Sequence, residues 1–262
     1  MIRAVFLLLV ALTLAACGTG PSPTGQAAAI PPGTIVAPDF GDRRPVVWPA
    51  GQDPQTYVVH GIDVSVWQGG IDWATARAHG VNFAYLKATE GGERVDAGFA
   101  ANWRAAKAAG VPRGAYHFFY HCRAASEQAR WFLSHVPKDA AALPPVLDME
   151  WTPLSPTCPD KRPAEEVRRD ARVFLKAVGR ATGRRPVLYT TVDFYSETAL
   201  WKLTGVDFWL RSTAAHPSDV FPGQHWLIWQ YSATGSVPGI AGDVDLNAFQ
   251  GGRGAFLSWV AG

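Results

Sequence analysis

Two carboxylates separated by one residue, Asp148 and Glu150, close the stretch Leu143–Trp151, which opens on a proline pair followed by a short apolar run. In an extended strand, residues i and i+2 point to the same face, with Cα atoms roughly 6.5–7 Å apart. We therefore expect these side chains to share one space, where their protonation is coupled. Such a pair suits acid/base chemistry, although acidic residues also occur at solvated strand ends.

The composition is that of a globular protein: 262 residues, 48% of them hydrophobic and 18% charged. The net charge is +2, from 24 basic and 22 acidic residues, and no Lys/Arg run is present. We therefore expect no nucleic-acid partner. The 11 Trp and seven Tyr fit core packing, but Trp also offers sugar rings a flat surface, which modestly favours a carbohydrate ligand.

The first 56 residues differ from the rest. Residues 1–16 combine Arg3 with an apolar run too short to span a bilayer comfortably, which predicts an export signal. Its end, Leu14-Ala15-Ala16-Cys17, resembles a bacterial lipoprotein processing site, so we predict lipidation of Cys17 and anchoring to a membrane of the cell envelope. An ordinary secretory signal is the alternative. Residues 17–56, rich in Pro, Gly, Ala, Ser and Thr, predict a flexible linker whose end near Trp48 could pack on the domain.

From residue 57 onward, short apolar runs alternate with segments of helical spacing, several of which end in Gly. This alternation predicts a parallel sheet covered by helices. Because no Gly-rich phosphate loop follows the first run, we favour an irregular (β/α) barrel over residues 57–262 to an open nucleotide-binding sheet. After Gln230 the helical pattern stops, and residues 236–249 predict turns and short strands.

Polar residues end nearly every apolar run. In a barrel these ends meet at the mouth, where enzymes of this architecture build their sites. The residues are Asp63, Lys87 with Glu90, His117, Asp148 with Glu150, Tyr189, Arg211 and Gln230.

Two cysteines remain if Cys17 is acylated. Cys122 and Cys158 both follow expected strand ends on one face of the barrel, and export favours oxidation, so we predict a disulfide rather than two free thiols. Closing a loop of about 36 residues stabilises by roughly 3–4 kcal/mol in the chain-entropy model. No Cys/His cluster has zinc-ligand spacing, and we expect neither a metal nor another cofactor.

Carboxylates at strand ends, without a Ser/His nucleophile elbow, favour glycoside hydrolysis. That reaction needs a protonated carboxyl group for the leaving oxygen and an anionic group that supports the transition state or activates water. Glu150, beside Asp148 and Trp151, is the expected acid, because negative charge and apolar surroundings both raise a carboxyl pKa.

Six stretches, in this order, resemble the family 25 glycoside hydrolases, the Chalaropsis-type lysozymes. The resemblance covers the whole domain from about residue 57 to 262, but not the signal or the linker. The stretches are His60-Gly61-Ile62-Asp63-Val64-Ser65-Val66-Trp67-Gln68-Gly69, Tyr85-Leu86-Lys87-Ala88-Thr89-Glu90-Gly91, Gly114-Ala115-Tyr116-His117-Phe118-Phe119, Asp148-Met149-Glu150, Trp229-Gln230-Tyr231 and Val244-Asp245-Leu246-Asn247-Ala248-Phe249.

The resemblance implies a flattened barrel of five β/α units plus extra strands. It implies a monomeric peptidoglycan hydrolase that cleaves the β-1,4 bond between N-acetylmuramic acid and N-acetylglucosamine. Glu150 would be the general acid, and Asp63, Asp148 and Asp245 would orient groups and stabilise charge. Asp245 is preferred to Asp243 because it occupies the Val-Asp-x-Asn position.

Further residues are candidates for substrate contacts. Tyr116, Tyr189, Trp209 and Trp229 could contact sugars or belong to the core, and Lys87 and Arg211 could bind polar substrate groups or neutralise the acidic cluster. The route stays open between retention, inversion and attack by the substrate's own 2-acetamido group, of which we favour the last. The alternatives in function are an inactive glycan-binding lipoprotein, an anchored structural lipoprotein and a metal-dependent deacetylase, for which His117 and His121 alone supply too few ligands.

Overall fold

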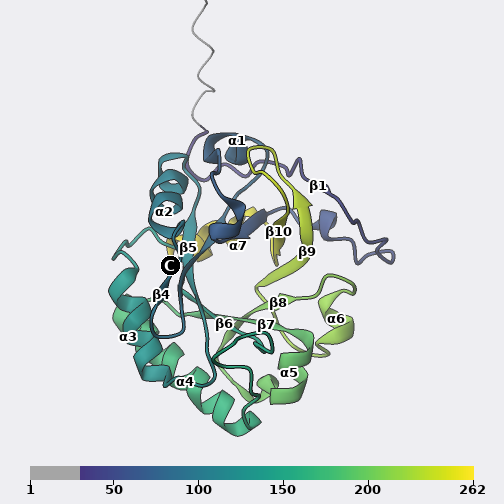
Figure 1. The fold of residues 1–262 in the computed structure, drawn as a ribbon. Helices are drawn as coiled ribbons and strands as arrows, with labels where there is room; N and C mark the ends of the chain where they lie inside the picture. The colour runs from purple at the N-terminus through teal and green to yellow at the C-terminus, as the bar shows by residue number, and fades with distance from the viewer. Residues whose placement is uncertain (1–29) are drawn as a thin grey trace, which may run out of the picture.

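The computed structural model describes residues 30–262, and Figure 1 shows its elements. The strands are β1 (Gly41–Asp42), β2 (His60–Val64), β3 (Ala84–Glu90), β4 (Arg94–Val95), β5 (Arg113–Phe118), β6 (Val146–Met149), β7 (Val187–Thr191), β8 (Asp207–Arg211), β9 (Ile228–Ser236) and β10 (Val244–Phe249). The helices are α1 (Trp73–Ala78), α2 (Phe99–Ala108), α3 (Ala125–His135), α4 (Ala164–Thr182), α5 (Val192–Thr198), α6 (Pro217–Val220) and α7 (Arg253–Ala261).

Eight of these strands close into a barrel in the order β2-β3-β5-β6-β7-β8-β9-β10, with β10 returning to β2. The pairings from β2 through β9 are parallel, whereas β10 is antiparallel to both of its neighbours. Helices α1 to α5 follow five of the parallel strands and cover the outside of the barrel (Figure 1). The prediction of an irregular (β/α) barrel with about five β/α units and extra strands is confirmed.

Large side chains fill the inside of the barrel below its mouth. The ring centroids of Tyr85 and Trp209 lie 5.0 Å apart, and both residues belong to an inner cluster with Phe83 and Phe256. Gly114 on β5 makes room for Tyr85, since a Cβ there would stand 2.2 Å from the Tyr85 ring. The barrel is therefore a packed core with space for ligand only at its mouth.

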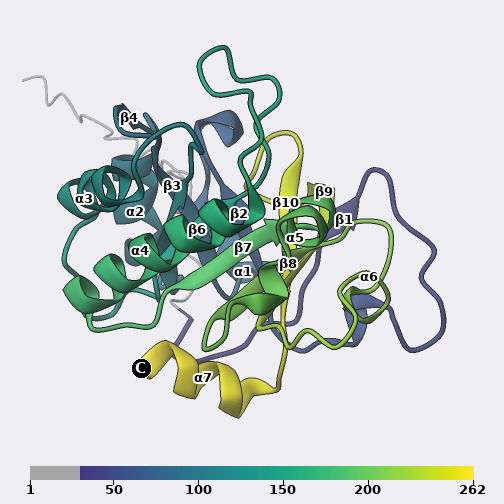
Figure 2. The same ribbon diagram turned by 90° about the horizontal axis from the view of Figure 1, so that it is seen from below.

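Helix α7 lies across the end of the barrel opposite the mouth (Figure 2). Its Phe256 is buried against Phe83 and Phe249, at centroid distances of 5.8 and 5.2 Å. The expectation that helical structure stops after Gln230 was wrong for this segment. The sequence Arg253–Ala261 is apolar around most of its circumference, so it lacks the amphipathic period that marks a surface helix.

The segment from residue 30 to 56 lies against the barrel, so the predicted flexible linker does not extend to residue 56. Gly41 and Asp42 pair with β9, and the Trp48 ring packs edge-on against Trp229 at 5.1 Å. Arg43 forms an ion pair with Asp243 at 2.8 Å. The composition of this segment predicted a linker because only a few of its side chains contact the barrel. These few contacts hold the extended segment against the edge of the sheet.

The predicted signal and the lipidation site at Cys17 fall within residues 1–29, outside the described part of the chain. Both therefore stay predictions. Between residues 30 and 262, no helix is long and apolar enough to cross a membrane.

Candidate active site

A cavity of about 400 Å³ opens at the carboxyl ends of the parallel barrel strands. Nine of the ten residues predicted for catalysis or substrate binding line it, because they stand at strand ends with their side chains on the inner face. The lining residues are Asp63, Ser65, Trp67, Lys87, Tyr116, Phe118, Asp148, Glu150, Tyr189, Trp209, Arg211, Gln230 and Asp245.

Asp63 on β2 is fixed by two amide donors. Gln230 Nε2 and Asn247 Nδ2 both donate to its Oδ2, at 2.9 and 2.8 Å. Burial raises the pKa of Asp63 to about 6, against the opposing effect of these two hydrogen bonds and the Arg211 charge. Asp63 is therefore a held carboxyl group that stays partly protonated at mildly acidic pH.

Asp245 is the register partner of Asp63 across the antiparallel β10–β2 pair. Burial and the Asp63 charge raise the pKa of Asp245 to about 8, while Arg211 opposes the shift. Asp243 lies outside the cavity, exposed and paired with Arg43. The structure thus brings Asp245, rather than Asp243, into the carboxylate cluster.

Asp148 stands at the end of β6, with 6% of its surface exposed. Its Oδ1 has no hydrogen-bond partner among the described residues. Burial and the neighbouring Glu150 charge raise the pKa of Asp148 well above its usual value. A buried carboxyl group without a donor is most stable when protonated.

Glu150 lies two residues after Asp148, on the same face of the extended chain, and is more exposed than Asp148. Burial raises its pKa too, although the Arg211 and Lys87 charges work against the shift. The pair therefore holds its protons more tightly than two ordinary carboxyl groups, and Glu150 is its more exposed member.

Two cations face this acidic cluster. Lys87 Nζ pairs with Glu90 Oε2 at 2.6 Å and sits 4.5 Å from the centre of the Phe118 ring. Arg211 lies at the end of β8, in register with Gln230 on β9. Both can neutralise the carboxylates and remain available to polar groups of a ligand. No group of three or more His, Cys, Asp or Glu side chains within residues 30–262 is arranged to hold a metal ion.

Five aromatic side chains line the cavity, and three of them, Tyr116, Tyr189 and Trp209, were predicted as substrate contacts. Trp209 donates its indole N–H to Asn247 Oδ1 at 2.8 Å, and Tyr189 donates its hydroxyl to Gln230 Oε1 at 2.9 Å. Burial raises the pKa values of Tyr116 and Tyr189 well above 10, so both phenols are neutral hydrogen-bonding groups. Trp209 and Tyr189 thus hold the amides of Asn247 and Gln230, which in turn hold Asp63.

Trp229 does not lie in this cavity, and the prediction that it contacts sugar needs correction. It is fully buried on the outer face of β9, where its N–H donates to the Ser212 carbonyl at 2.8 Å. Successive residues of a strand point to opposite faces. Because Gln230 points inward to Asp63, Trp229 has to point outward.

Three lining residues were not predicted at the barrel mouth: Ser65, Trp67 and Phe118. Gln230 was predicted at the mouth, as the polar end of an apolar run, but without a role. Strand parity identifies Phe118, which shares a face with Tyr116. Ser65 and Trp67 lie in the turn after β2, within the segment that resembles the lysozymes, and only the course of that turn places them at the cavity.

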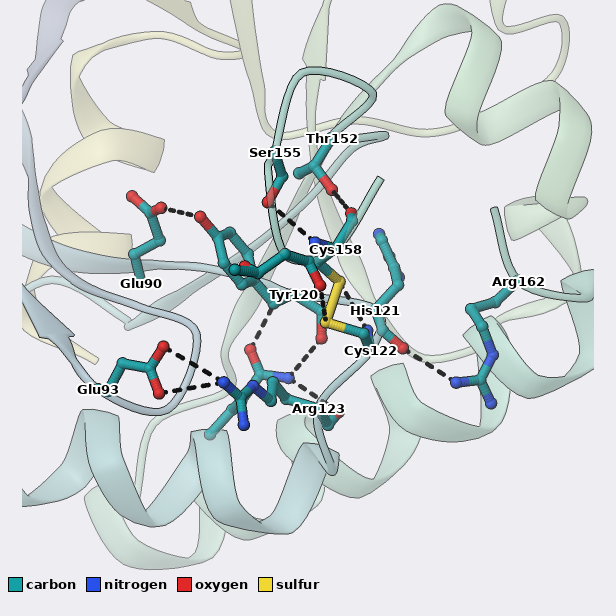
Figure 3. Close-up of a disulfide and its surroundings, with 12 residues drawn as sticks. Glu90, Glu93, Tyr120, His121, Cys122, Arg123, Thr152, Ser155, Cys158 and Arg162 are labelled. Carbon is teal, nitrogen blue, oxygen red and sulfur yellow. Dashed lines mark hydrogen bonds and ion pairs between the residues drawn. A yellow bond between two sulfur atoms is a disulfide. The ribbon is translucent and has the colours of Figure 1, made fainter. Parts of the chain in front are cut away.

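A disulfide joins the two loops beside Glu150, as predicted for Cys122 and Cys158 (Figure 3). The neighbouring His121 donates from Nε2 to the Glu150 carbonyl at 3.0 Å, and the Arg162 guanidinium donates to the His121 carbonyl at 3.2 Å. The main chain at Glu150 is therefore held by a cross-linked loop as well as by β6.

The loop after β5 also reaches the cation at the cavity wall. Tyr120, two residues before Cys122, donates its hydroxyl to Glu90, which is the partner of Lys87. In Figure 3, Tyr120 and Glu90 lie on the side of the disulfide away from Arg162. One cross-linked loop thus contacts the surroundings of both Glu150 and Lys87.

Known proteins are similar to this chain in sequence and in fold. The family model "Glycosyl hydrolases family 25" matches residues 62–240. Lysozyme M1 of Streptomyces globisporus is 35% identical over 277 aligned positions, covering 98% of this chain and 94% of that protein. An uncharacterized Escherichia coli K12 protein, YegX, is 38% identical over 217 residues, covering 81% of this chain and 77% of that protein.

Solved structures agree. The bacterial lysozyme of Streptomyces coelicolor superposes with a TM-score of 0.68 at 37% identity, over 78% of this chain and 97% of that structure. A family 25 glycosyl hydrolase from Bacillus anthracis gives a TM-score of 0.69 at 31% identity, over 78% and 94% of the two chains. With a matching family model over most of the barrel and relatives that cover nearly its full length, the chain belongs to family 25 of the glycosyl hydrolases.

Proposed function

We propose that this protein is an N-acetylmuramidase, which hydrolyses the β-1,4 bond between N-acetylmuramic acid and N-acetylglucosamine in peptidoglycan. The observation that supports this most strongly is the cluster of Asp63, Asp148, Glu150 and Asp245 at one cavity, faced by two cations and neutral aromatic donors. Glycoside hydrolysis needs such carboxyl groups in unequal protonation states. The cluster supplies them through unequal burial.

Glu150 is the general acid in this proposal. It is more exposed than Asp148, and its raised pKa keeps it protonated for a larger fraction of molecules than an ordinary glutamate. It can therefore deliver a proton to the leaving glycosidic oxygen. The cross-linked loop bonds to its main-chain carbonyl and so holds the backbone that carries it.

Asp148 is a poor candidate for a carboxylate nucleophile, because burial and the Glu150 charge raise its pKa and so disfavour its anionic form. We infer that the substrate's 2-acetamido group attacks the anomeric carbon, with Asp148 as the group that orients this amide. Asp63, with a pKa of about 6, is mostly ionised near neutral pH and then balances the positive charge that develops on the sugar, whereas Asp245, with a pKa of about 8, is mostly protonated there and orients groups through hydrogen bonds. Measuring the anomeric configuration of the first-formed product by ¹H NMR tests the route: retention agrees with it and inversion excludes it.

The central experiment incubates residues 30–262 with purified peptidoglycan, reduces the products with borohydride and identifies the new ends by mass spectrometry. The wild type should produce reducing ends at muramic acid, and Glu150→Gln should lower the rate by about 10²–10⁴-fold. Asp245→Asn should also impair cleavage, whereas Asp243→Asn, two residues away and outside the cavity, is the matched control.

The alternative is a glycan-binding protein without turnover. Retention of glycan by both wild type and Glu150→Gln, with no new reducing ends from either, would favour it. Equal cleavage by both proteins would instead mean that another carboxyl group is the acid, and Asp63, Asp148 and Asp245 would be tested in turn.

We also propose that the protein is exported and anchored to a membrane through lipidated Cys17. The lipoprotein-like sequence before Cys17 supports this, and so does a disulfide at Cys122 and Cys158, which forms readily outside the cytoplasm. Metabolic labelling with a palmitate analogue should mark the wild type but not Cys17→Ala. If neither protein is labelled, Cys17 is not lipidated, and the protein is either secreted or kept inside the cell.

A further inference from the structure

Trp67 is an unusual side chain for its surroundings. It is 87% exposed, yet it lines the cavity that holds the four carboxyl groups. Large apolar side chains are normally withdrawn from water, and an exposed one beside a polar cavity commonly marks a binding surface.

The turn that carries Trp67 is firmly held. Residues 66–68 form a single 3-10 turn directly after β2, the strand that bears Asp63. Ser65 caps this turn with its side chain, and its own N–H donates to Gln68 Oε1 at 2.9 Å. The exposed indole therefore stands on a fixed support.

Two longer contacts fix the turn to neighbouring parts of the site. The Val66 N–H donates to Asp96 Oδ2 at 2.9 Å, and Gln68 Nε2 donates to the Asp243 carbonyl at 3.1 Å. The second contact ties the turn to the residues just before Asp245. The position of the indole is thus coupled to the strands that carry Asp63 and Asp245, and a rigid aromatic surface loses little entropy when it binds.

Two further apolar side chains near the turn that carries Trp67 are exposed to solvent. Val66 and Val95 are each 45% exposed, and Val95 precedes Asp96, which bonds to the turn. We call these two valines and Trp67 the apolar ledge; of the three, Trp67 lines the polar cavity. A hexopyranose matches this contrast, because its ring faces present C–H groups while hydroxyl and acetamido groups project from its edge.

We propose that the Trp67 indole is a stacking platform for a pyranose ring of the glycan strand, at a subsite outside the carboxylate cluster. This inference rests on the proposed function for the identity of the ligand. It adds that the protein holds at least one sugar beyond the space enclosed by the four carboxyl groups.

The test uses the Glu150→Gln protein labelled with 5-fluorotryptophan, so that the ligand is not cleaved. Comparison with the same protein carrying Trp67→Phe assigns the ¹⁹F signal of Trp67, and a Trp201→Phe variant assigns a control. Trp201 is also exposed, at 51%, but it precedes β8 and so lies at the end of the strands opposite the mouth. Adding a peptide-free peptidoglycan tetrasaccharide should shift the Trp67 signal and leave the Trp201 signal in place.

The matched affinity and rate measurements use Trp67→Ala and Trp201→Ala. Trp67→Ala should weaken tetrasaccharide binding by about tenfold, the size of one lost aromatic contact. In the active protein it should raise KM by a similar factor and leave kcat within about twofold, because the contact is equal in the ground and transition states. Trp201→Ala should change neither quantity.

A Trp67 signal unmoved by a glycan that shifts other tryptophan signals would overturn the proposal. So would a Trp67 response only to fragments that carry peptide stems, since that would make the ledge a peptide site. A Trp67 response to the tetrasaccharide with no cleavage by wild type would uphold the sugar platform and reject the muramidase.

Discussion

Asp63 and Asp245 are paired residues of two antiparallel strands, and both side chains point into the cavity. Adjacent strands bring paired residues close, where like charges repel. Burial raises the pKa of Asp63 to about 6 against the amide donors and Arg211, and burial together with the Asp63 charge raises the pKa of Asp245 to about 8. The fold therefore holds an acidic pair at the expense of stability, as expected of a functional site.

Asp245→Asn should stabilise the protein at alkaline pH. Because the folded pKa of Asp245 lies above its unfolded value, its contribution to stability is complete below about pH 4 and is lost as the pH rises through about 8. The variant should gain on the order of 2–4 kcal/mol in unfolding free energy at pH 8 and little at pH 4.5. Urea denaturation at both pH values measures this, and Asp243→Asn is the control. An equal effect at both pH values would contradict the charge argument.

Arg211→Gln should move the pH dependence of cleavage upward. The Arg211 charge lowers the pKa values of Asp63, Glu150 and Asp245, so its removal should raise all three. The alkaline limb of kcat/KM, where the acid loses its proton, should shift by about one pH unit. Arg185, which pairs with Asp207 at the start of β8, is the matched control. A fall in rate with no change in the limb would assign Arg211 to binding alone.

Replacing Cys122 and Cys158 together by Ala should lower the unfolding free energy by about 3–4 kcal/mol, the chain-entropy value for a loop of this length. It should also lower kcat more than it changes KM, because the released loop contacts the Glu150 carbonyl through His121. Thr152→Val, which removes only the hydrogen bond to the Cys158 carbonyl, should cost about 1 kcal/mol. An unchanged kcat in a folded double variant would separate the cross-link from catalysis.

His117→Gln should make the protein less sensitive to acid. Burial lowers the pKa of His117 to about 4, so the stability held by the neutral imidazole is complete above about pH 6.5 and is lost as the pH falls through about 4. The wild type should lose about 2–3 kcal/mol more than the variant between pH 7 and pH 4. Comparing the wild type with the variant cancels the contributions of the carboxyl groups that both proteins share. His225→Gln, at an exposed position, should behave as wild type.

Residues 57–262 alone should be less stable than residues 30–262. The shorter chain loses the β1–β9 pairing and the contact of Trp48 with Trp229. Burial of one large side chain stabilises a protein by about 1.5–3 kcal/mol, so the melting temperature of the shorter chain should be clearly lower. Trp48→Ala in the longer chain isolates the aromatic part of this effect. Equal melting temperatures for both lengths would restore the interpretation of the whole segment as a linker.

The sequence alone was enough to predict the fold class and most of the residues at the ends of the barrel strands. Alternating apolar runs and helical segments predict a barrel, and polar residues such as Asp63 and Asp148 at run ends predict its mouth. These inferences depend on local periodicity and on the rule that parallel strands end at one edge. The prediction for His117 was wrong: it is buried on the outer face of β5, against Gln128 and Phe174 of the covering helices, and not at the mouth.

Only the tertiary structure decided which aromatic residues face the cavity and which pack outside it. Both faces of a barrel strand are buried, so hydrophobicity does not separate the inward Trp209 from the outward Trp229. The position of Trp67 depends on a turn, and the packing of residues 30–56 depends on a distant sheet edge. The Asp63–Asp245 pair likewise needs β10 to return beside β2, and closure of the barrel between segments far apart in sequence is what sets the charges of the site.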